Sequence, residues 1–297
     1  MRIMLANPPP WPDGKRCAVA FSFDVDADSV VHATATTLKE SFFALQYMRY
    51  DPMVAIPRLT QLFGDLEVPT TFFVPAWVAE SYPNSLECIV KYDNEVAHHG
   101  YYHEWPTKQT PAEQQDTILS AHETLSSLTG GVTVGYRAPY YGITEETIAI
   151  LAEAGFLYDS SLFADDVPIL LRTNKGDLIE LPIPDSVDDY NQYVSARAFN
   201  YLMTVSPPDR AVKVFRSEFD ALWEFGGLWV GVWHPAISGR PARVLEIRKL
   251  IEYMQTKGDV WFATHAQIAN HIRGLIERKE WSPRVDVLPL YPELARN

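Results

Sequence analysis

An acidic run follows the first apolar segment of the chain, in the sequence Phe-Asp-Val-Asp-Ala-Asp that begins at Phe23. Side chains two positions apart on a strand point the same way, so Asp24 and Asp26 are expected to enter one site. Two neighbouring carboxylates repel each other, and a bound cation offsets that repulsion. An acidic loop that caps a strand would have the same sequence, so the pair by itself leaves both interpretations open.

Histidines cluster in one short segment. Of the eight histidines, three fall within six residues, in the sequence His-His-Gly-Tyr-Tyr-His that begins at His98. His99 and His103 are four residues apart, so one helical turn would put both imidazoles on one face. Neutral imidazole is a common ligand of zinc and related metals. Chance pairs occur on surface helices, but this clustering after a short predicted strand favours a metal site, with His98 as a structural or supporting residue.

Arg137 begins the sequence Arg-Ala-Pro-Tyr, directly after a strand predicted over residues 132–135. Pro139 favours an extended conformation at Ala138 and stiffens the turn. Arg137 is then placed to clamp a carboxylate with its fork of donors. A surface arginine before a turn is the simpler interpretation if the motif is taken alone.

His234 stands at the end of an apolar strand, in the sequence Trp-His-Pro. A histidine in that position is a candidate general acid, and the alternative is a core histidine bonded to a backbone carbonyl. Asp159, in the sequence Tyr-Asp-Ser-Ser, could orient His234 or another histidine of the site. Taken alone, Asp159 is equally well explained as a turn residue.

The elements that would position these residues alternate between β and α. Strands are predicted over residues 17–23, 69–75, 94–98, 132–135, 178–183, 228–233 and 259–263. Helices are predicted over residues 54–66, 111–128, 144–154, 209–225, 241–257 and 265–277, with Thr110 and Thr144 as caps and Gly155 as a stop. This alternation indicates an α/β protein with a mainly parallel sheet wrapped by helices, either a barrel or a doubly wound open sheet.

Three segments are expected to be irregular, at residues 25–52, 163–176 and 185–197. The last is rich in Asp and Tyr, and such loops at strand ends are where α/β proteins place specificity. The length of 297 residues, with no evident linker or repeat, fits one domain over residues 1–297.

Composition and charge limit the classes of partner. A formal net charge of −13 argues against nucleic acid, and it fits poorly with a strongly anionic polymer as substrate. No segment predicts a membrane span or a signal peptide. With two cysteines, Cys17 in an apolar run and Cys88, a disulfide framework is not expected, and a reduced cytoplasmic location fits best. Apolar residues near the C-terminus suggest a homo-oligomer.

The five motifs together, in this order and at this spacing, resemble the polysaccharide deacetylase family, carbohydrate esterase family 4. The resemblance covers residues 21–234. The segments around these motifs are similar to those of a subgroup of peptidoglycan-deacetylase-like proteins and cyclic imide hydrolases. The segments that suggest it are TTFFVPAWVAE, EVAHHGYYHE, YDSSLFADDVP, WHPAISGRP and GDVWFATH. The fold that this resemblance implies is a distorted (β/α) barrel of mainly parallel strands, formed as a single catalytic domain.

The resemblance also implies roles for individual residues. One divalent metal, with zinc as the default, would be held by Asp26, His99 and His103. Asp24 would be the catalytic base, and His234 would be the acid that protonates the leaving nitrogen. The remaining roles are positioning of Asp24 by Arg137, tuning of a histidine by Asp159, and substrate contacts by Tyr140 and Trp105.

In one respect the chain departs from most of the family, where the two aspartates are adjacent; here Val25 separates them. Which aspartate is base and which is ligand therefore stays open. The expected reaction is metal-dependent hydrolysis of a non-peptide C–N bond in a small-molecule or oligosaccharide amide. Deacetylation of an N-acetylated sugar and ring opening of a cyclic imide or allantoin-like amide both remain. An inactive carbohydrate-binding protein is the alternative of another class.

Overall fold

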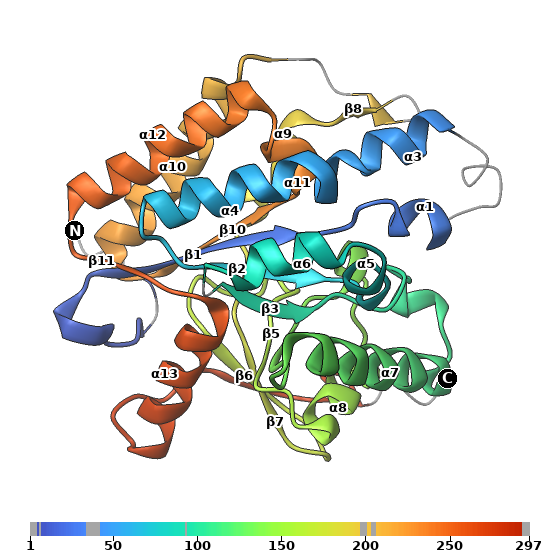
Figure 1. Ribbon diagram of the computed structural model, residues 1–297. Helices are drawn as coiled ribbons and strands as arrows, with labels where there is room; N and C mark the ends of the chain where they lie inside the picture. The colour runs from blue at the N-terminus through green and yellow to red at the C-terminus, as the bar shows by residue number, and fades with distance from the viewer. Residues whose placement is uncertain are drawn as a thin grey trace.

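The structure, a computed structural model, describes residues 5, 7–33, 42–92, 94–196, 201–202 and 206–292. A mainly parallel sheet runs through its centre (Figure 1). Its strands are β1 (Cys17–Asp24), β2 (Thr70–Val74), β3 (Glu95–His98), β4 (Gly135–Tyr136), β5 (Tyr158–Asp159), β6 (Ile169–Arg172), β7 (Asp177–Glu180), β10 (Leu228–Trp233), β11 (Val260–Phe262) and β12 (Val285–Val287).

The strand order is β10-β1-β2-β3-β4-β5-β7-β6-β12, and β11 pairs with β1. Every pairing in this sheet is parallel except β6 with β7. An isolated parallel bridge joins Asp188, beyond β7, to Val232 of β10, so the chain returns to the strand at the far end of the sheet. The predicted fold class, a distorted barrel of mainly parallel strands, is confirmed. Two short strands, β8 (Ser195–Ala196) and β9 (Tyr201–Leu202), pair separately.

Helices cover the sheet. They are α1 (Ser29–Ala33), α3 (Phe42–Met48), α4 (Ile56–Asp65), α5 (Ala76–Ser81), α6 (Pro83–Val90), α7 (Pro111–Thr129), α8 (Glu145–Ala154), α9 (Asp189–Tyr193), α10 (Pro208–Phe225), α11 (Pro235–Ser238), α12 (Pro241–Lys257) and α13 (His265–Glu277). In Figure 1, α4, α10 and α12 lie above β1 and β10, while α7, α8 and α13 lie below. Within the described chain, no helix is long and apolar enough to span a lipid bilayer.

Strand β1 explains how the fold separates core from site. Its side chains alternate between the helices outside and the interior of the sheet. Phe21 faces outward, 5.2 Å from the ring of Phe63 on α4 and 5.1 Å from the ring of Trp229 on β10. Burial of each such aromatic side chain stabilises the fold by roughly 1.5–3 kcal/mol. The inward positions run from alanines to Ser22 and Asp24, so this face turns polar at the end where the site lies.

The predicted helix boundaries depend on caps, and these are confirmed. Thr110 and Thr144 each form a capping box at the start of α7 and α8. Gly155 ends α8 in the left-handed conformation, with φ +84°. Cys17 is a buried free cysteine, as expected from its apolar surroundings.

The segments expected to be irregular contain more regular structure than the sequence predicts. Residues 25–52 include α1 and α3, residues 163–176 include β6, and residues 185–197 include α9 and β8. These elements have at most seven residues, too few for an apolar period to stand out. The strand predicted over residues 132–135 is shorter and later, at β4.

Candidate functional site

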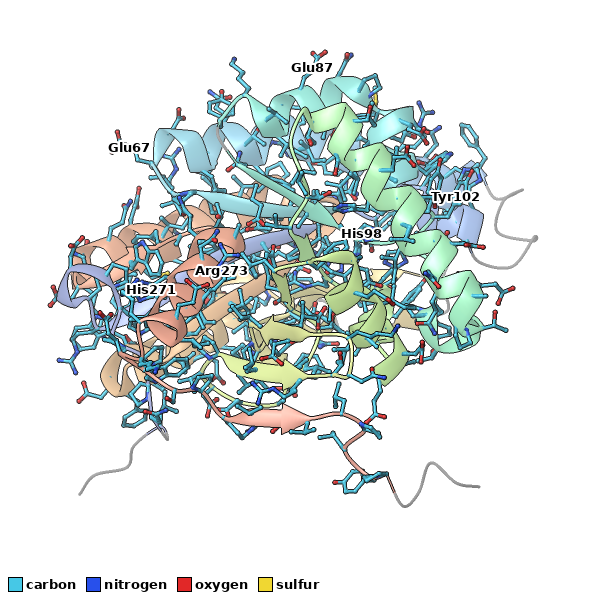
Figure 2. All side chains as sticks on the ribbon, turned by 90° about the horizontal axis from the view of Figure 1, so that it is seen from below. Glu67, Glu87, His98, Tyr102, His271 and Arg273 are labelled. Atoms are coloured by element: carbon cyan, nitrogen blue, oxygen red, sulfur yellow. The ribbon has the colours of Figure 1, made fainter. Side chains whose placement is uncertain are left out.

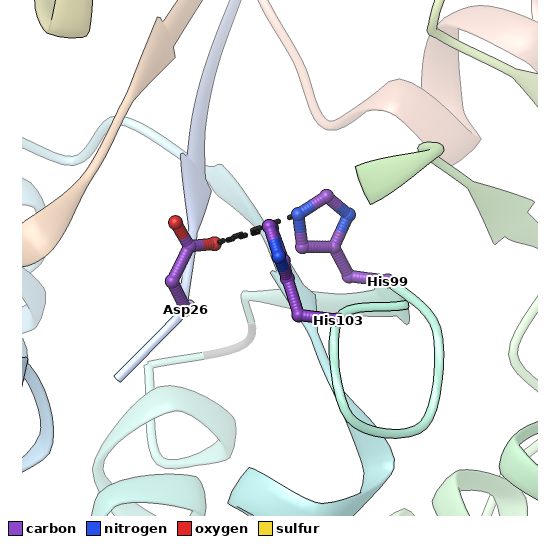
Figure 3. A group of neighbouring side chains, drawn as sticks. All are labelled: Asp26, His99 and His103. Atoms are coloured by element: carbon purple, nitrogen blue, oxygen red, sulfur yellow. Dashed lines mark ion pairs between the residues drawn. The ribbon is translucent and has the colours of Figure 1, made fainter. Parts of the chain in front are cut away.

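Both aspartates of the acidic run lie in one site at the C-terminal end of β1. Asp26 Oδ1 is 3.2 Å from Nε2 of His103 and 3.5 Å from Nε2 of His99 (Figure 3). Asp24 Oδ2 is 3.9 Å from the same Nε2 of His99. The four residues are at most 7% exposed. Asp24 is the last residue of β1 and Asp26 lies two residues beyond it, and both carboxylates lie beside the histidine pair.

The histidine pair does not lie on a helix, so the prediction of a helical turn is wrong. Gly100 and His103 have φ of +77° and +64°, which no α-helix contains. The carboxylate of Glu104 accepts hydrogen bonds from the backbone N–H groups of Tyr101 and Tyr102 and fixes a tight loop. A Cβ at Gly100 would lie 3.0 Å from Glu104 Oε2, so this loop also depends on glycine.

The tautomer of His99 is set by a backbone carbonyl. Its Nδ1 lies 2.8 Å from the carbonyl oxygen of Arg137, to which it donates, so Nε2 carries the free lone pair. That lone pair faces Asp26, whose Oδ1 accepts no hydrogen bond from the described residues although it is buried. Two imidazole nitrogens around an otherwise unpaired carboxylate oxygen are the donor set of a divalent metal site. The residues present therefore fit a metal.

The electrostatics of Asp26 agree with a strong attraction to positive charge. Burial by itself would raise the pKa of this carboxyl. The neighbouring His103 and His99 outweigh burial and hold the pKa of Asp26 well below its usual range. Asp26 is thus an anion surrounded by imidazoles, ready to serve as a ligand.

Arg137 is fully buried and binds Asp24. Its Nη1 donates to Asp24 Oδ1 at 2.7 Å and to Ser22 Oγ at 2.8 Å. Its Nε donates to the carbonyl oxygen of Ser160 at 2.8 Å, and the guanidinium lies over the ring of Phe73 at 4.0 Å. The clamp on a carboxylate that the sequence predicts for Arg137 is therefore present, with Asp24 as the partner.

His234 lies across the site from the other histidines and is oriented by Asp189. Nδ1 of His234 is 2.7 Å from Asp189 Oδ1, and its Nε2 is 3.9 Å from Asp26 Oδ2. Burial lowers the pKa of His234, but the charges of Asp189 and Asp26 outweigh burial and raise it well above its usual value. The sequence analysis did not name Asp189. The one available signal was its position in the segment rich in Asp and Tyr.

The expectation that Asp159 orients a site histidine is not met, because Asp189 holds His234. The carboxylate of Asp159 accepts hydrogen bonds from Ser161 Oγ at 2.7 Å and from its backbone N–H at 3.2 Å. Glu180 lies opposite Asp159 on β7, and burial raises the pKa of both carboxyls. Asp159 therefore shapes the buried surroundings of Arg137 rather than the histidines.

Two aromatic side chains lie at the surface beside the histidine loop. The ring of Tyr140 is 4.5 Å from that of His103 and 4.6 Å from that of Trp105, measured between centroids. Tyr140 is 41% exposed and Trp105 38% exposed, so both can contact a bound molecule. Of these two predicted substrate contacts, Tyr140 lies next to the metal-ligand candidate His103, and Trp105 lies next to Tyr140.

His98 has a structural position. Its Nε2 is 3.1 Å from the carbonyl oxygen of Ile118 on α7, and its Nδ1 accepts from the backbone N–H of Gly100. Figure 2 shows His98 between the sheet and α7, whereas Tyr102 lies at the periphery. Burial lowers the pKa of His98 to about 3, so the ring is neutral. It anchors the loop that carries His99 and His103.

A second group, Asp188, Asp189 and His234, also brings ligand atoms within 4.8 Å of one another. Its atoms already have partners, because Asp188 Oδ2 accepts from Tyr141 and Asp189 accepts from His234 and Ser238. The group at Asp26 is the better candidate metal centre, since its Oδ1 has no such partner among the described residues.

Fold and site together define an α/β barrel hydrolase with a candidate metal centre at the strand ends. The family model for polysaccharide deacetylase matches residues 47–158. A crystal structure assigned as a polysaccharide deacetylase from Mycobacterium smegmatis is 37% identical, with a TM-score of 0.89 and coverage of 95% of this chain and 98% of that one. A peptidoglycan deacetylase from Helicobacter pylori is 29% identical, covering 73% of this chain and 83% of the relative.

A peptidoglycan deacetylase-like protein from Gibberella zeae is 27% identical, covering 95% of this chain and 86% of the relative. The chain belongs to the polysaccharide deacetylase family. The family resemblance suggested by the five motifs is thereby confirmed. Membership makes the chain a deacetylase-like hydrolase of C–N bonds.

Proposed function

We propose that this protein is a metal-dependent hydrolase that removes acetyl groups from N-acetylated amino sugars. The observation that carries the proposal is the position of a carboxylate, Asp24, beside the candidate metal ligands, with an oriented imidazole, His234, facing them. Arg137 and Asp189 hold these two groups in place. A base and an acid around a metal centre are what hydrolysis of an unactivated amide requires.

In the proposed reaction, Asp24 accepts the proton of the attacking water, because its Oδ2 lies within 4 Å of the candidate ligand His99. Arg137 binds Asp24 Oδ1 and keeps the carboxylate aimed at the site. His234 donates a proton from Nε2 to the departing nitrogen. Its Nδ1–H remains hydrogen-bonded to Asp189. A divalent metal held by Asp26, His99 and His103, proposed to be zinc, would polarise the amide carbonyl and make the water more acidic.

An N-acetylated amino sugar is supported by the relatives named as peptidoglycan deacetylases and by Trp105 and Tyr140 at the surface of the site. Aromatic rings offer flat apolar faces on which a sugar ring can lie.

One observation favours a smaller substrate. The residues of the candidate centre are at most 7% exposed. Such burial suits a small cyclic imide, whose ring opening would use the same base and acid.

A substrate panel with metal analysis tests the proposal. N-acetylglucosamine oligomers, peptidoglycan fragments, succinimide, hydantoin and allantoin are incubated with the protein, with and without a chelator. Chelator-sensitive release of acetate from the first two is the expected result. Turnover of succinimide but of no N-acetylated sugar would make a cyclic imide, rather than an amino sugar, the substrate of this protein. Absence of both metal and turnover would favour a carbohydrate-binding protein without activity.

A further inference from the structure

A buried polar cluster lies behind Arg137, on the side away from the candidate metal centre. It comprises Thr71 on β2, Glu95 on β3, Tyr158 on β5 and His265 at the start of α13. Thr71 and His265 are fully buried, and the proposed reaction uses none of the four. Burying polar groups costs folding free energy unless all of them are hydrogen-bonded. The hydrogen bonds within this cluster therefore indicate what it does.

Glu95 sets the direction of the hydrogen bonds. Its carboxylate accepts from Tyr158 Oη at 2.7 Å, from the backbone N–H of Ala266 at 2.8 Å and from Thr71 Oγ1 at 2.9 Å. Tyr158 reaches Glu95 because β4 has a glycine at position 135, where a Cβ would lie 1.9 Å from the tyrosine ring. Since Thr71 has one hydroxyl proton and donates it to Glu95, its Oγ1 can only accept from other groups.

This direction fixes the tautomer of His265. The backbone N–H of His265 donates to Thr71 Oγ1 at 2.9 Å, and its Nδ1 lies 3.0 Å from the same oxygen. Nδ1 must therefore carry the ring proton, which leaves Nε2 with a free lone pair. Burial and the charge of Arg137 hold the pKa of His265 well below its usual value, so the ring stays neutral.

The free lone pair points at Arg137. Nε2 of His265 lies 3.4 Å from Nη2 of Arg137, whose other amino group, Nη1, binds Asp24. The ring cannot easily turn away, because it stacks on Tyr158 at 5.8 Å and meets the edge of Phe73 at 5.2 Å. His265 behind the guanidinium and Asp24 in front of it, together with Ser160, which accepts from Nε and Nη2, leave the arginine one orientation.

We propose that His265 is a positioning residue for the hydrolytic reaction: as an acceptor held by Thr71 and Glu95, it fixes the Arg137 guanidinium and thereby the direction of Asp24. This inference rests on the proposed function. It adds to that function a residue that touches neither the substrate nor the candidate metal ligands. The same geometry predicts that Thr71 contributes through its hydroxyl group.

The first test compares His265→Phe with His265→Gln. Phe keeps the aromatic packing but has no acceptor, whereas the Gln side-chain oxygen can reach the place of Nε2. For His265→Phe we expect kcat to fall about 10–100-fold, with KM within about twofold and bound metal unchanged. His265→Gln should recover most of the lost kcat. Thermal unfolding of both variants separates a loss of fold from a loss of positioning.

A second pair keeps the test decisive if His265→Phe does not fold. Thr71→Val removes the hydroxyl that holds His265, and Thr71→Ser retains it. We expect Thr71→Val to lower kcat in the same way and Thr71→Ser to behave like the wild type. Nitrogen-15 NMR of the wild-type ring, with His265→Gln to assign the signal, should show a protonated Nδ1 and a bare Nε2.

The outcomes separate this inference from the proposed function. If the wild type hydrolyses amides and His265→Phe keeps its kcat, or if Nε2 is the protonated nitrogen, the positioning role is overturned and the proposed function stands. If the wild type with its metal hydrolyses no amide, the proposed function fails. The tautomer measured by NMR then still decides whether His265 is an acceptor for Arg137.

Discussion

The two polar regions of the barrel differ in how completely they are paired. In the cluster around His265, Glu95 accepts three hydrogen bonds and Thr71 both donates and accepts. In the candidate metal centre, Asp26 Oδ1 is buried without a hydrogen bond from any described residue. Full pairing is what a fixed scaffold requires, whereas an unpaired carboxylate oxygen beside two imidazoles indicates a place for a ligand that the chain does not supply.

Removal of a ligand from the candidate metal centre should have the largest effect on activity. His103→Ala takes away one of two imidazoles, so we expect loss of the bound metal and of turnover. Metal content by mass spectrometry and acetate release measure both. His271→Ala, on α13, where the half-buried ring packs against Trp11 and Trp261 rather than the candidate metal centre, is the matched control and should change neither. A His103→Ala protein that keeps full activity in the presence of chelator would contradict the metal hypothesis.

Removal of the proposed acid, His234, should have the next largest effect and leave bound metal in place. For His234→Ala we expect kcat to fall by about 10²–10⁴-fold, the usual contribution of general acid catalysis. Bound metal measured on the same sample should equal that of the wild type. Loss of metal would instead indicate that His234 is a metal ligand. The candidate metal centre would then include His234 as well as Asp26, His99 and His103.

A smaller effect is expected where the scaffold meets the site, at Asp189. Asp189→Asn keeps the shape but removes the charge that holds Nδ1 of His234, so we expect kcat to fall about 10–100-fold. Asp188→Asn is the matched control, because its carboxylate binds Tyr141 rather than His234. Steady-state kinetics on both variants check this. Equal losses of kcat in the two variants would show that the negative charge of the loop matters, and not the orientation of the imidazole.

The smallest effect is expected at the surface of the site. Trp105→Ala removes an aromatic face, so we expect KM for the preferred substrate to rise about 2–10-fold with kcat unchanged. Tyr140→Phe keeps its ring and should leave KM close to that of the wild type. Initial-rate measurements over a range of substrate concentrations distinguish the two. An unchanged KM in Trp105→Ala would place the substrate elsewhere.

Local features of the chain were readable from the sequence. Strand β1, the capped helices α7 and α8, and the gathering of Asp24, Asp26 and His99 follow from periodicity and caps. These depend on residues close in sequence or on the common end of parallel strands.

Contacts between distant residues were not readable in this way. Asp189 lies 45 residues from His234, and Arg137 lies 128 residues from His265. No sequence period reports such contacts. The loop at Gly100 was missed for another reason, because a spacing of four fits a helix as well as a tight loop closed by Glu104.

Arg137 has a further consequence, because it contacts the candidate metal centre through both its backbone and its side chain. Its backbone carbonyl oxygen binds Nδ1 of His99, and its side chain binds Asp24. Metal binding through His99 and the orientation of Asp24, the proposed base, therefore depend on the same residue, and a coupling free energy between two such events is reciprocal. A change that restricts the side-chain conformations of Asp24 should also raise the affinity of the site for the metal. Metal binding should in turn restrict the side-chain conformations of Asp24.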